Sequence, residues 1–419
     1  MAGRLMAPHE ETIARIIGLR AGHSLSGVVL LHIAMFSDTY FPYISGVVRS
    51  IERLSDGLRE RGHTVTIFGP RYMGHSHDAD KMEQISRCPA LPIYPPGNIV
   101  FPLPSIVSLT RQVRTMKVDV IHAHSPFTMG LAALQVGRRL DIPVVFTHHS
   151  VYHEYAVYFP KPLRAPTERA ILHWVSHYVQ QADQVVVPSL ATREFVRETY
   201  GVDCAVVSNP IVGPHNGTSK SNRADLSAPI LVYVGRLGKE KRLPLLIQAF
   251  SLVRKKTPAH LVLVGDGPER AHLEELAEEL RVGRFITITG FLPYDQVSDW
   301  YQRANVFVFS SDKETQGMVM LEALAHGVPV VAVRSEASEA ILDVCRAGCI
   351  TESEPGPMAQ AIMAMLSDPQ ALAQMSEEGL MYAQRFSPER IAERMERVYQ
   401  LAGITMHPLM DPSYRSDSK

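Results

Sequence analysis

Two glutamates, Glu314 and Glu322, are the side chains whose type and spacing best suit chemistry. Glu314 lies in a polar loop just before a helical pattern, and Glu322 lies within that helix on a nearby face. Gly317 would let a ligand approach the backbone N–H groups that a helix start leaves unpaired. Carboxylates accept from hydroxyls and amides hold phosphate, so the segment predicts a site for a polyhydroxylated, phosphorylated ligand. A capped helix with two solvated glutamates is the alternative, and the surrounding Gly317, Gly327 and Pro329 argue against it.

A basic turn, GRLGKEK at residues 235–241, directly follows an apolar run. Its cations Arg236 and Lys241 are five residues apart and flank Gly238. They can converge on a diphosphate and neutralise the charge that develops on a leaving group without a metal ion. A solvated basic turn is the alternative. No Asp-x-Asp pair directly follows one of the apolar runs, which weakens the case for a metal.

Gly46 and several histidines give weaker signals in the first half of the chain. Gly46 lies where a helix starts, so backbone amides and the helix dipole would point at a ligand. His149 follows another apolar run and can either reach a cleft or be structural. His122 and His124 are spaced to point the same way from a strand, but no third ligand for a metal is evident.

Apolar runs alternate with helical patterns along most of the chain, in two series. The runs are residues 29–36, 64–68, 118–124, 143–148 and 184–189, then residues 229–235, 260–265, 285–290, 306–310 and 329–333. They are almost continuously apolar, which is typical of strands buried on both faces and therefore of parallel sheets covered by helices. The alternation of strand and helix predicts doubly wound sheets.

A polar stretch rich in Gly, Ser and Asn, residues 213–228, separates the two series and predicts an interdomain linker. We therefore expect an α/β protein with two doubly wound, Rossmann-like parallel-sheet domains, residues 29–212 and 229–386, which face each other across a cleft. Residues 1–28 would be an N-terminal extension and residues 403–419 a C-terminal tail. Ligands bind beyond the carboxyl ends of strands in such sheets, so the loops named above should meet in the cleft.

The composition excludes several classes of protein. The 419 residues include 42 basic and 43 acidic side chains, which argues against a protein whose main task is to grip nucleic acid. No apolar run approaches the ~20 residues of a membrane span, and the charged N-terminus lacks the apolar core of a signal peptide. The four cysteines form neither a common zinc spacing nor a convincing disulfide framework. A cytoplasmic protein is expected, with peripheral contact to the inner face of a membrane left open.

Taken together, the motifs resemble retaining, nucleotide-sugar-dependent glycosyltransferases of the GT-B fold, family four, over about residues 30–400. The segments that carry the resemblance are FSDTYFPYISGVVRS (36–50), DVIHAHSPF (119–127), VGRLGKEKR (234–242), VGDGPE (264–269), GFLPY (290–294) and the segment with the two glutamates. As a set they are highly specific. SDTYFPYISGV, HAHSPF and ETQGMV look most like diacylglycerol glucosyltransferases, with phosphatidylinositol mannosyltransferases as near relatives.

The resemblance implies a role for each candidate residue. Arg236 and Lys241 would bind the donor diphosphate and Glu322 the nucleotide ribose, while Glu314 and His149 would lie against the sugar; Arg236, Lys241, Glu314 and His149 form the catalytic group. The other donor-side residues are Gly46, Phe291, Leu292, Thr315, Gln316, Gly317, Met318 and Val319, and the acceptor-side residues are Asp38, Tyr40 and Tyr152. The last helix, about residues 387–402, would cross back to the first domain.

Two positions depart from the family pattern. Pro210 follows Asn209 where many relatives have glycine, and proline stiffens a loop that glycine would let flex. Arg242 follows Lys241 where relatives often have glycine, so a side chain is added beside the expected phosphate pocket. The first departure puts the hinge-side contacts in doubt, but not the donor site.

The resemblance implies transfer of a hexose, most simply glucose, from a UDP-sugar to a hydroxyl with retention at the anomeric carbon. No carboxylate is obviously placed as a nucleophile, and the family precedent is front-face attack, in which the departing phosphate oxygen takes the acceptor's proton. Neither a metal nor a cofactor is expected besides the donor substrate. The expected acceptor is a membrane lipid such as diacylglycerol. Two alternatives stay open. One is a glycosyltransferase that acts on a soluble acceptor, of the phosphatidylinositol or sugar-phosphate type. The other is a nucleotide-sugar isomerase or binding protein of the same fold that transfers nothing.

A lipid acceptor would need an apolar and basic landing surface, for which residues 161–181 are a candidate. Ile171, Leu172, Val175, Tyr178 and Val179 would share one helical face, near Trp174 and downstream of Lys161, Arg164 and Arg169. The alternative, which we favour, is that this face packs on the sheet, because a doubly wound fold needs a covering helix there. The first half of the chain is mildly basic, which either suits an anionic membrane partner or reflects ordinary fluctuation in composition.

Overall fold

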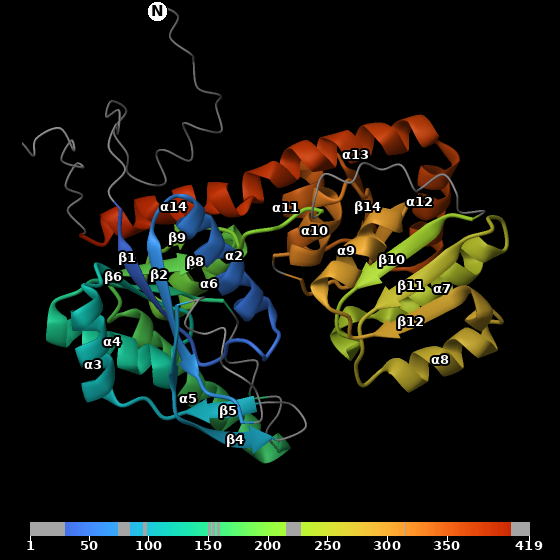
Figure 1. Cartoon of the computed structure of the whole chain (residues 1–419). Helices are drawn as coiled ribbons and strands as arrows, with labels where there is room; N and C mark the ends of the chain where they lie inside the picture. Colours follow the sequence, from blue (N-terminus) through green and yellow to red (C-terminus); the bar gives the residue numbers. More distant parts are fainter. Residues whose placement is uncertain are drawn as a thin grey trace, which may run out of the picture.

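A computed structural model describes residues 30–73, 84–94, 99–149, 152, 156, 160–214, 228–314 and 316–403. The expected extension at 1–28, most of the linker at 213–228 and nearly all of the tail at 403–419 lie outside these residues. The described part contains two parallel sheets with helices packed against them, joined near the top of the view by the last helices (Figure 1). This arrangement confirms the predicted pair of doubly wound, Rossmann-like domains.

The first domain is built on a seven-stranded parallel sheet. Its strands are β1 (His32–Phe36), β2 (Thr64–Pro70), β3 (Ile85–Cys88), β6 (Val120–Ala123), β7 (Val144–Thr147), β8 (Gln184–Val187) and β9 (Ala205–Val206), and a separate hairpin pairs β4 (Ala90–Tyr94) with β5 (Ile99–Pro102). Its helices are α2 (Gly46–Glu60), α3 (Ile106–Met116), α4 (Thr128–Leu140), α5 (Lys161–Val179) and α6 (Leu190–Tyr200).

The second domain is built on a six-stranded parallel sheet. Its strands are β10 (Ile230–Val234), β11 (His260–Val264), β12 (Ile286–Gly290), β13 (Val306–Phe309), β14 (Val330–Val333) and β15 (Gly348–Thr351). Its helices are α7 (Leu243–Arg254), α8 (Arg270–Glu279), α9 (Tyr294–Arg303), α10 (Met318–Ala325), α11 (Glu336–Cys345), α12 (Pro355–Ser367) and α13 (Pro369–Ala383), and the chain ends in α14 (Pro388–Leu401). Short 3-10 helices span Lys239–Lys241, Gly283–Phe285 and Gln384–Phe386.

Both sheets reverse direction in strand order at one point. The orders are β3-β2-β1-β6-β7-β8-β9 and β12-β11-β10-β13-β14-β15. The reversal therefore lies between β1 and β6 in the first sheet and between β10 and β13 in the second. Loops leave the sheet in opposite directions at such a point and open a crevice beyond the carboxyl ends of the strands, where doubly wound folds bind ligands.

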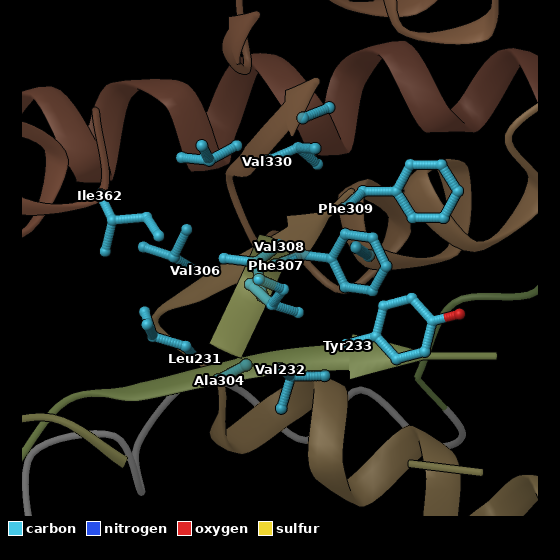
Figure 2. Packing of buried hydrophobic residues seen from close by; sticks show 14 of the residues in the cluster. Leu231, Val232, Tyr233, Ala304, Val306, Phe307, Val308, Phe309, Val330 and Ile362 are labelled. Carbon is cyan, nitrogen blue, oxygen red and sulfur yellow. The ribbon is translucent and has the colours of Figure 1, made fainter. Parts of the chain in front are cut away.

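The central strands of the second sheet, β10, β11, β13 and β14, are buried on both faces, as their continuous apolar runs predict, whereas the edge strand β12 is only partly buried. Val306, Phe307, Val308 and Phe309 of β13 are all at most 1% exposed. Figure 2 shows them packed between the neighbouring strands, with Tyr233 of β10 beside the two phenylalanine rings. A strand with no solvent-facing side consists almost entirely of apolar residues, and for this reason the sequence predicted the central strands.

Helix α14 packs on the first domain after α13 has packed on the second, so the last helices connect the two (Figure 1). Ile391, Met395 and Tyr399 are buried in one cluster with residues of α2 and the first sheet. The backbones of α2 and α14 touch at Gly57, where an added Cβ would lie 2.3 Å from Pro388 O. None of the described helices is long and apolar enough to span a membrane.

Several short elements have no counterpart among the predicted runs. Strands β3 and β15 are only partly buried, β9 has two residues, and the β4–β5 hairpin stands apart from both sheets. Edge strands that lack one covering layer do not need the continuous apolar pattern that marked the central strands.

Candidate active site

Lys241 and Glu314 form an ion pair at the reversal point of the second sheet. Lys241 ends the 3-10 turn after β10, Glu314 lies in the loop after β13, and Lys241 Nζ is 3.0 Å from Glu314 Oε2. The two loops are also tied through Ser310, whose hydroxyl donates to Lys241 O at 2.7 Å. About a fifth of each charged side chain is exposed, 23% and 22%. The structure therefore brings together two of the predicted catalytic residues, with room for a ligand to reach both.

Arg236 lies in the same loop as Lys241, and its side chain is exposed. Its backbone is held in place, because Tyr233 Oη donates to Arg236 O at 3.1 Å and Gly238 N donates to the same oxygen at 3.0 Å. The exposed side chain of Arg236 thus starts from a fixed backbone position. Such a cation can approach an anionic ligand at little conformational cost to the fold.

Backbone without side chains lines this edge of the second sheet. Strand β10 is followed by Gly235 and β11 by Gly265, with φ of 151° and 142°. An added Cβ on Gly265 would lie 2.0 Å from Gly235 O. Only glycine permits both this conformation and this close approach. Backbone atoms rather than side chains therefore lie beside Arg236, and a phosphorylated ligand can approach them closely.

The two glutamates of the predicted pair have different surroundings. Glu314 Oε1 accepts a hydrogen bond from Gly317 N at 3.3 Å, so this carboxylate contacts the start of α10 as well as Lys241. Glu322, one turn before the end of α10, is 8% exposed. Its Oε1 lies 2.8 Å from Arg53 Nη1, and its Oε2 accepts from Tyr301 Oη at 3.2 Å. Glu322 is thus a buried carboxylate at the contact between the domains.

Sequence reasoning missed Arg53 altogether. It lies on α2 of the first domain, 4% exposed, and reaches across to Glu322 of the second. Its guanidinium carbon is 4.6 Å from the centre of the Tyr294 ring. In the sequence it is one more arginine on an amphipathic helix, a pattern that usually indicates a solvated face. No local signal could have found it.

The remaining donor-side residues lie around the start of α10 and after β12. Asn209 lies in the segment between the domains, residues 207–214, which follows β9. Its Nδ2 donates to Gln316 Oε1 at 2.5 Å and so connects this segment to the loop before α10. Gln316, Met318 and Val319 are half-buried, Leu292 packs partly against the core, and Phe291 is 77% exposed. Thr315 lies outside the described residues. An exposed ring at the carboxyl end of a strand can stack on a flat ligand.

Three histidines, His122, His124 and His149, contact one another in a row that begins at α14. His122 Nδ1 lies 2.9 Å from Tyr399 Oη of α14, and its Nε2 lies 2.7 Å from Thr147 Oγ1. His124, whose ring centre is 4.1 Å from that of His122, places Nδ1 3.0 Å from His149 Nε2. His122 and His124 therefore support His149, which is half-buried and lies furthest from α14.

Burial keeps these imidazoles uncharged. Desolvation, assisted by His148, lowers the pKa of His149 to about 3, and desolvation with the nearby His149 lowers the pKa of His122 to about 3. Desolvation also holds the pKa of His124 well below its usual range. At neutral pH His149 is therefore a neutral hydrogen-bonding group rather than a proton donor. Within the described residues, no group of three or more His, Cys, Asp or Glu side chains could hold a metal ion.

Gly46 begins α2, and the hydroxyl of Ser45 accepts from Val48 N at 3.3 Å to cap this helix. An added Cβ at Gly46 would meet no atom within 4 Å. Packing therefore does not require glycine here. The free space and the N-terminal end of the helix dipole are available to an anionic ligand.

The three residues predicted to contact the acceptor are largely occupied by contacts within the first domain. Tyr40 and Tyr152 are each 4% exposed and pack in the two clusters of the first domain. Asp38 Oδ1 accepts from Met129 N at 2.9 Å and from Thr128 Oγ1, so it caps α4. Each has a structural role in this conformation, and a role towards an acceptor stays a prediction.

Helix α5 covers the sheet with its second half. Val175, Tyr178 and Val179 are buried, and Ile171 and Leu172 pack partly against the same cluster. This supports the alternative that we favoured, a covering helix. The first half of α5 is different, because Lys161, Leu163, Arg164 and Arg169 are exposed on its surface.

Comparison with known proteins gives two family matches that together span most of the chain. Residues 44–212 match the model of "Glycosyltransferase Family 4", and residues 217–401 match that of "Glycosyl transferases group 1". Alpha-monoglucosyldiacylglycerol synthase of Acholeplasma laidlawii is 27% identical over 88% of this chain and 96% of its own. The enzyme of the same name from Streptococcus pneumoniae is 28% identical over 72% and 71%. A D-inositol 3-phosphate glycosyltransferase of Corynebacterium urealyticum is 30% identical over 71% and 74%.

Solved structures share the fold. Sucrose-phosphate synthase of Thermosynechococcus elongatus superposes with a TM-score of 0.67 at 20% identity, over 88% of this chain and 98% of its own. HepE of Anabaena, in complex with UDP and glucose, superposes with a TM-score of 0.66 at 16% identity, over 88% and 99%. At these identities the likeness shows that the two-domain fold is shared.

Proposed function

Because the chain belongs to glycosyltransferase family 4 and has its two-domain GT-B fold, we propose that this glycosyltransferase moves glucose from UDP-glucose to a hydroxyl of a membrane lipid such as diacylglycerol, with retention at the anomeric carbon. The Lys241–Glu314 ion pair is the observation that carries the proposal. A cation suited to phosphate beside a carboxylate suited to sugar hydroxyls supports a donor site at the carboxyl ends of these strands, where doubly wound folds bind ligands.

The transfer follows from charge placement. The bond between the sugar's anomeric carbon and the phosphate oxygen breaks, and its electron pair stays on the phosphate of UDP. Lys241 and Arg236 stabilise that negative charge. The acceptor oxygen bonds to the anomeric carbon from the same face, and its proton passes to the departing phosphate oxygen. No residue has to change its protonation state, which agrees with a neutral His149 that only positions the sugar.

The lipid acceptor is supported by two relatives and by the surface of the first domain. The relatives are the two alpha-monoglucosyldiacylglycerol synthases. On the β4–β5 hairpin, Leu91 and Phe101 are paired in register and are 56% and 45% exposed. Leu163 on the basic first half of α5 is 52% exposed. Exposed apolar side chains with basic neighbours suit an anionic membrane surface.

The test combines vesicle flotation with a transfer assay. Radiolabelled UDP-glucose, UDP-galactose and GDP-mannose are each offered with vesicles that contain diacylglycerol and anionic lipid. We expect the protein to float with the vesicles and to label lipid from UDP-glucose. Labelling only from GDP-mannose would contradict the assigned donor, and a β-linked product on NMR would contradict retention.

A soluble acceptor is the second candidate, because the D-inositol 3-phosphate glycosyltransferase is also similar. It would be favoured if the protein ignored anionic vesicles and labelled a sugar phosphate. Incubation of UDP-glucose without any acceptor distinguishes both transferase hypotheses, lipid and soluble acceptor, from an isomerase. An isomerase would produce an epimerised nucleotide sugar. Unchanged donor in that incubation, together with lipid labelling in the first assay, is the expected result.

A further inference from the structure

A buried ion pair joins the two domains at Glu322, the carboxylate to which the family resemblance assigns the nucleotide ribose of the donor. Arg53 Nη1 of α2 lies 2.8 Å from Glu322 Oε1 of α10, and the side chains are 5% and 11% exposed. The other oxygen, Oε2, accepts from Tyr301 Oη. Both oxygens of Glu322 are therefore engaged, one of them by a residue of the opposite domain.

Further contacts fix the guanidinium of Arg53 in this position. It lies over the Tyr294 ring, 4.6 Å from its centre, and Nη1 also donates to Pro210 O at 3.4 Å. Tyr294 in turn donates from Oη to Val212 O at 2.9 Å. Arg53 thus contacts α9, α10 and the segment between the domains at once. These contacts form only while the domains are close together.

Each of the two buried charges stabilises the other, whereas either charge buried alone would destabilise the fold. Burial by itself lowers the pKa of Arg53, but the nearby Glu322, Tyr294 and Glu52 together outweigh this effect, so the net pKa is raised and the guanidinium stays charged. Removal of one partner from a buried ion pair leaves an uncompensated charge in the interior. A ligand can therefore use Glu322 only if the contact with Arg53 breaks and both groups find new partners or water.

We propose that Arg53 competes with the nucleotide ribose for Glu322, so that the donor enters only after the Arg53–Glu322 contact has opened. The inference rests on the proposed function, since it takes Glu322 as the carboxylate that binds the ribose. Without donor, Arg53 satisfies Glu322 and holds α2 against α10. With donor, ribose hydroxyls donate to the carboxylate oxygens and the guanidinium returns to solvent at the edge of the opened contact.

Arg53 is a positioning residue in this scheme, because it acts on the donor through Glu322. Its removal should tighten nucleotide binding, whereas removal of a residue that helps to build the site would weaken it. The sign of the change therefore separates competition from direct assistance. A merely structural role predicts a loss of stability with no gain in affinity.

Calorimetric titration of the full chain with UDP, and separately with GDP, measures this sign. We expect Arg53→Met to bind the nucleotide that the unsubstituted protein prefers at least threefold more tightly, and Glu322→Gln to bind it more weakly. The matched control is Arg49→Met, one turn earlier on α2. Arg49 pairs with Glu52 at 2.8 Å and lies 5.7 Å from the Tyr294 ring centre. Among the described residues, no hydrogen bond or ion pair joins Arg49 to Glu322, so the nucleotide affinity of Arg49→Met should stay within twofold of that of the unsubstituted protein.

Small-angle scattering without nucleotide gives a second readout. Loss of the cross-domain pair should increase the radius of gyration of Arg53→Met relative to Arg49→Met. If Arg53→Met does not fold, Arg53→Lys keeps a charge but loses the planar group that stacks on Tyr294. It should show the same gain in affinity to a smaller extent.

The outcomes separate this inference from the proposed function. If the unsubstituted protein binds neither UDP nor GDP, the proposed function fails and the inference fails with it. If it binds nucleotide but Arg53→Met binds equally well or more weakly, the competition is wrong while the donor site stands. Tighter binding by Arg53→Met alone, with Arg49→Met unchanged, supports the competition.

Discussion

Lys241 Nζ lies 3.0 Å from Glu314 Oε2, although 73 residues separate them in the chain. Each follows one of the two neighbouring strands, β10 and β13, at which the strand order of the second sheet reverses. A crevice opens at such a point, and only the residues that follow these two strands can meet across it. The fold therefore turns two separate sequence motifs into one charged pair.

Replacement of Lys241 by Ala should lower kcat/KM for the donor by about 2–4 kcal/mol, roughly 30- to 1,000-fold, because one preorganised charge donor to the leaving group is lost. Initial-rate kinetics with varied UDP-glucose measures the effect. Lys239→Ala is the control, since Lys239 is an exposed cation two residues earlier. Equal kinetics for Lys241→Ala and the unsubstituted protein would remove Lys241 from the site.

Gly46 tests whether free space at the start of α2 serves a ligand. An added Cβ there would meet no atom within 4 Å, so Gly46→Val should fold with a melting temperature close to that of the unsubstituted protein. Its donor kcat/KM should nevertheless fall about 10- to 100-fold, because a displaced phosphate loses its alignment. The contrast is Gly57→Ala, whose Cβ would lie 2.3 Å from Pro388 O. That variant should lose about 1–3 kcal/mol of unfolding free energy through overpacking against α14. Normal activity of Gly46→Val would contradict a role in phosphate binding.

His124 should control the orientation of His149, because its Nδ1 lies 3.0 Å from His149 Nε2. An asparagine amide approximates the position of Nδ1, whereas a glutamine amide extends further, so His124→Asn should retain more turnover than His124→Gln. We expect the loss to appear in kcat rather than in KM for the donor. Circular dichroism and melting curves of both variants serve as the control for folding. Equal losses in the two variants would assign His124 to packing alone.

The pH dependence of the rate should carry no inflection from His149. Its pKa is lowered to about 3 by burial, so the ring is neutral throughout the range from pH 5 to pH 9. His149→Asn should therefore lower kcat by the same factor at pH 5.5, 7 and 8.5. A loss that grows or shrinks around pH 6.5 would show that the ring titrates in the working enzyme.

Glu396 should make the docking of α14 dependent on pH. Burial on its own raises the pKa of this carboxyl, but hydrogen bonds from His63 and Arg61 outweigh it and lower the pKa to about 2, from an ordinary value of 4.5. A carboxyl whose pKa is lower in the folded than in the unfolded chain contributes stability above about pH 4.5 and loses it as the pH falls towards 2.

The measurement for Glu396 is urea unfolding at pH 7 and at pH 3. Glu396→Gln should cost about 2–3 kcal/mol at pH 7 and clearly less at pH 3. Glu393→Gln, on the same helix but paired with the exposed Arg390 and Arg397, should cost less than about 1 kcal/mol at either pH. An equal cost of Glu396→Gln at both pH values would show that its ion pairs do not stabilise the fold.

Much of the architecture was predictable because strands buried on both faces require continuous apolar runs. The ten predicted runs all contain observed strands, from β1 at His32–Phe36 to β14 at Val330–Val333. The missed strands β3 and β15 are edge strands that are only partly buried. The covering role of α5 was also predictable, since Val175, Tyr178 and Val179 recur at helical spacing and face the core.

Sequence alone determined which loops carry charge and that these loops follow strands, because the type and order of residues along the chain dictate local structure. It identified Lys241 and Glu314 in this way, and Glu322 in the helix that follows the loop of Glu314. Only the tertiary structure decided their partners. Glu322 meets Arg53 across two domains and 269 positions of the chain, and His149 meets His124 from a neighbouring strand. Such contacts depend on how separate sheets and helices are placed in space, which no local pattern of residues records.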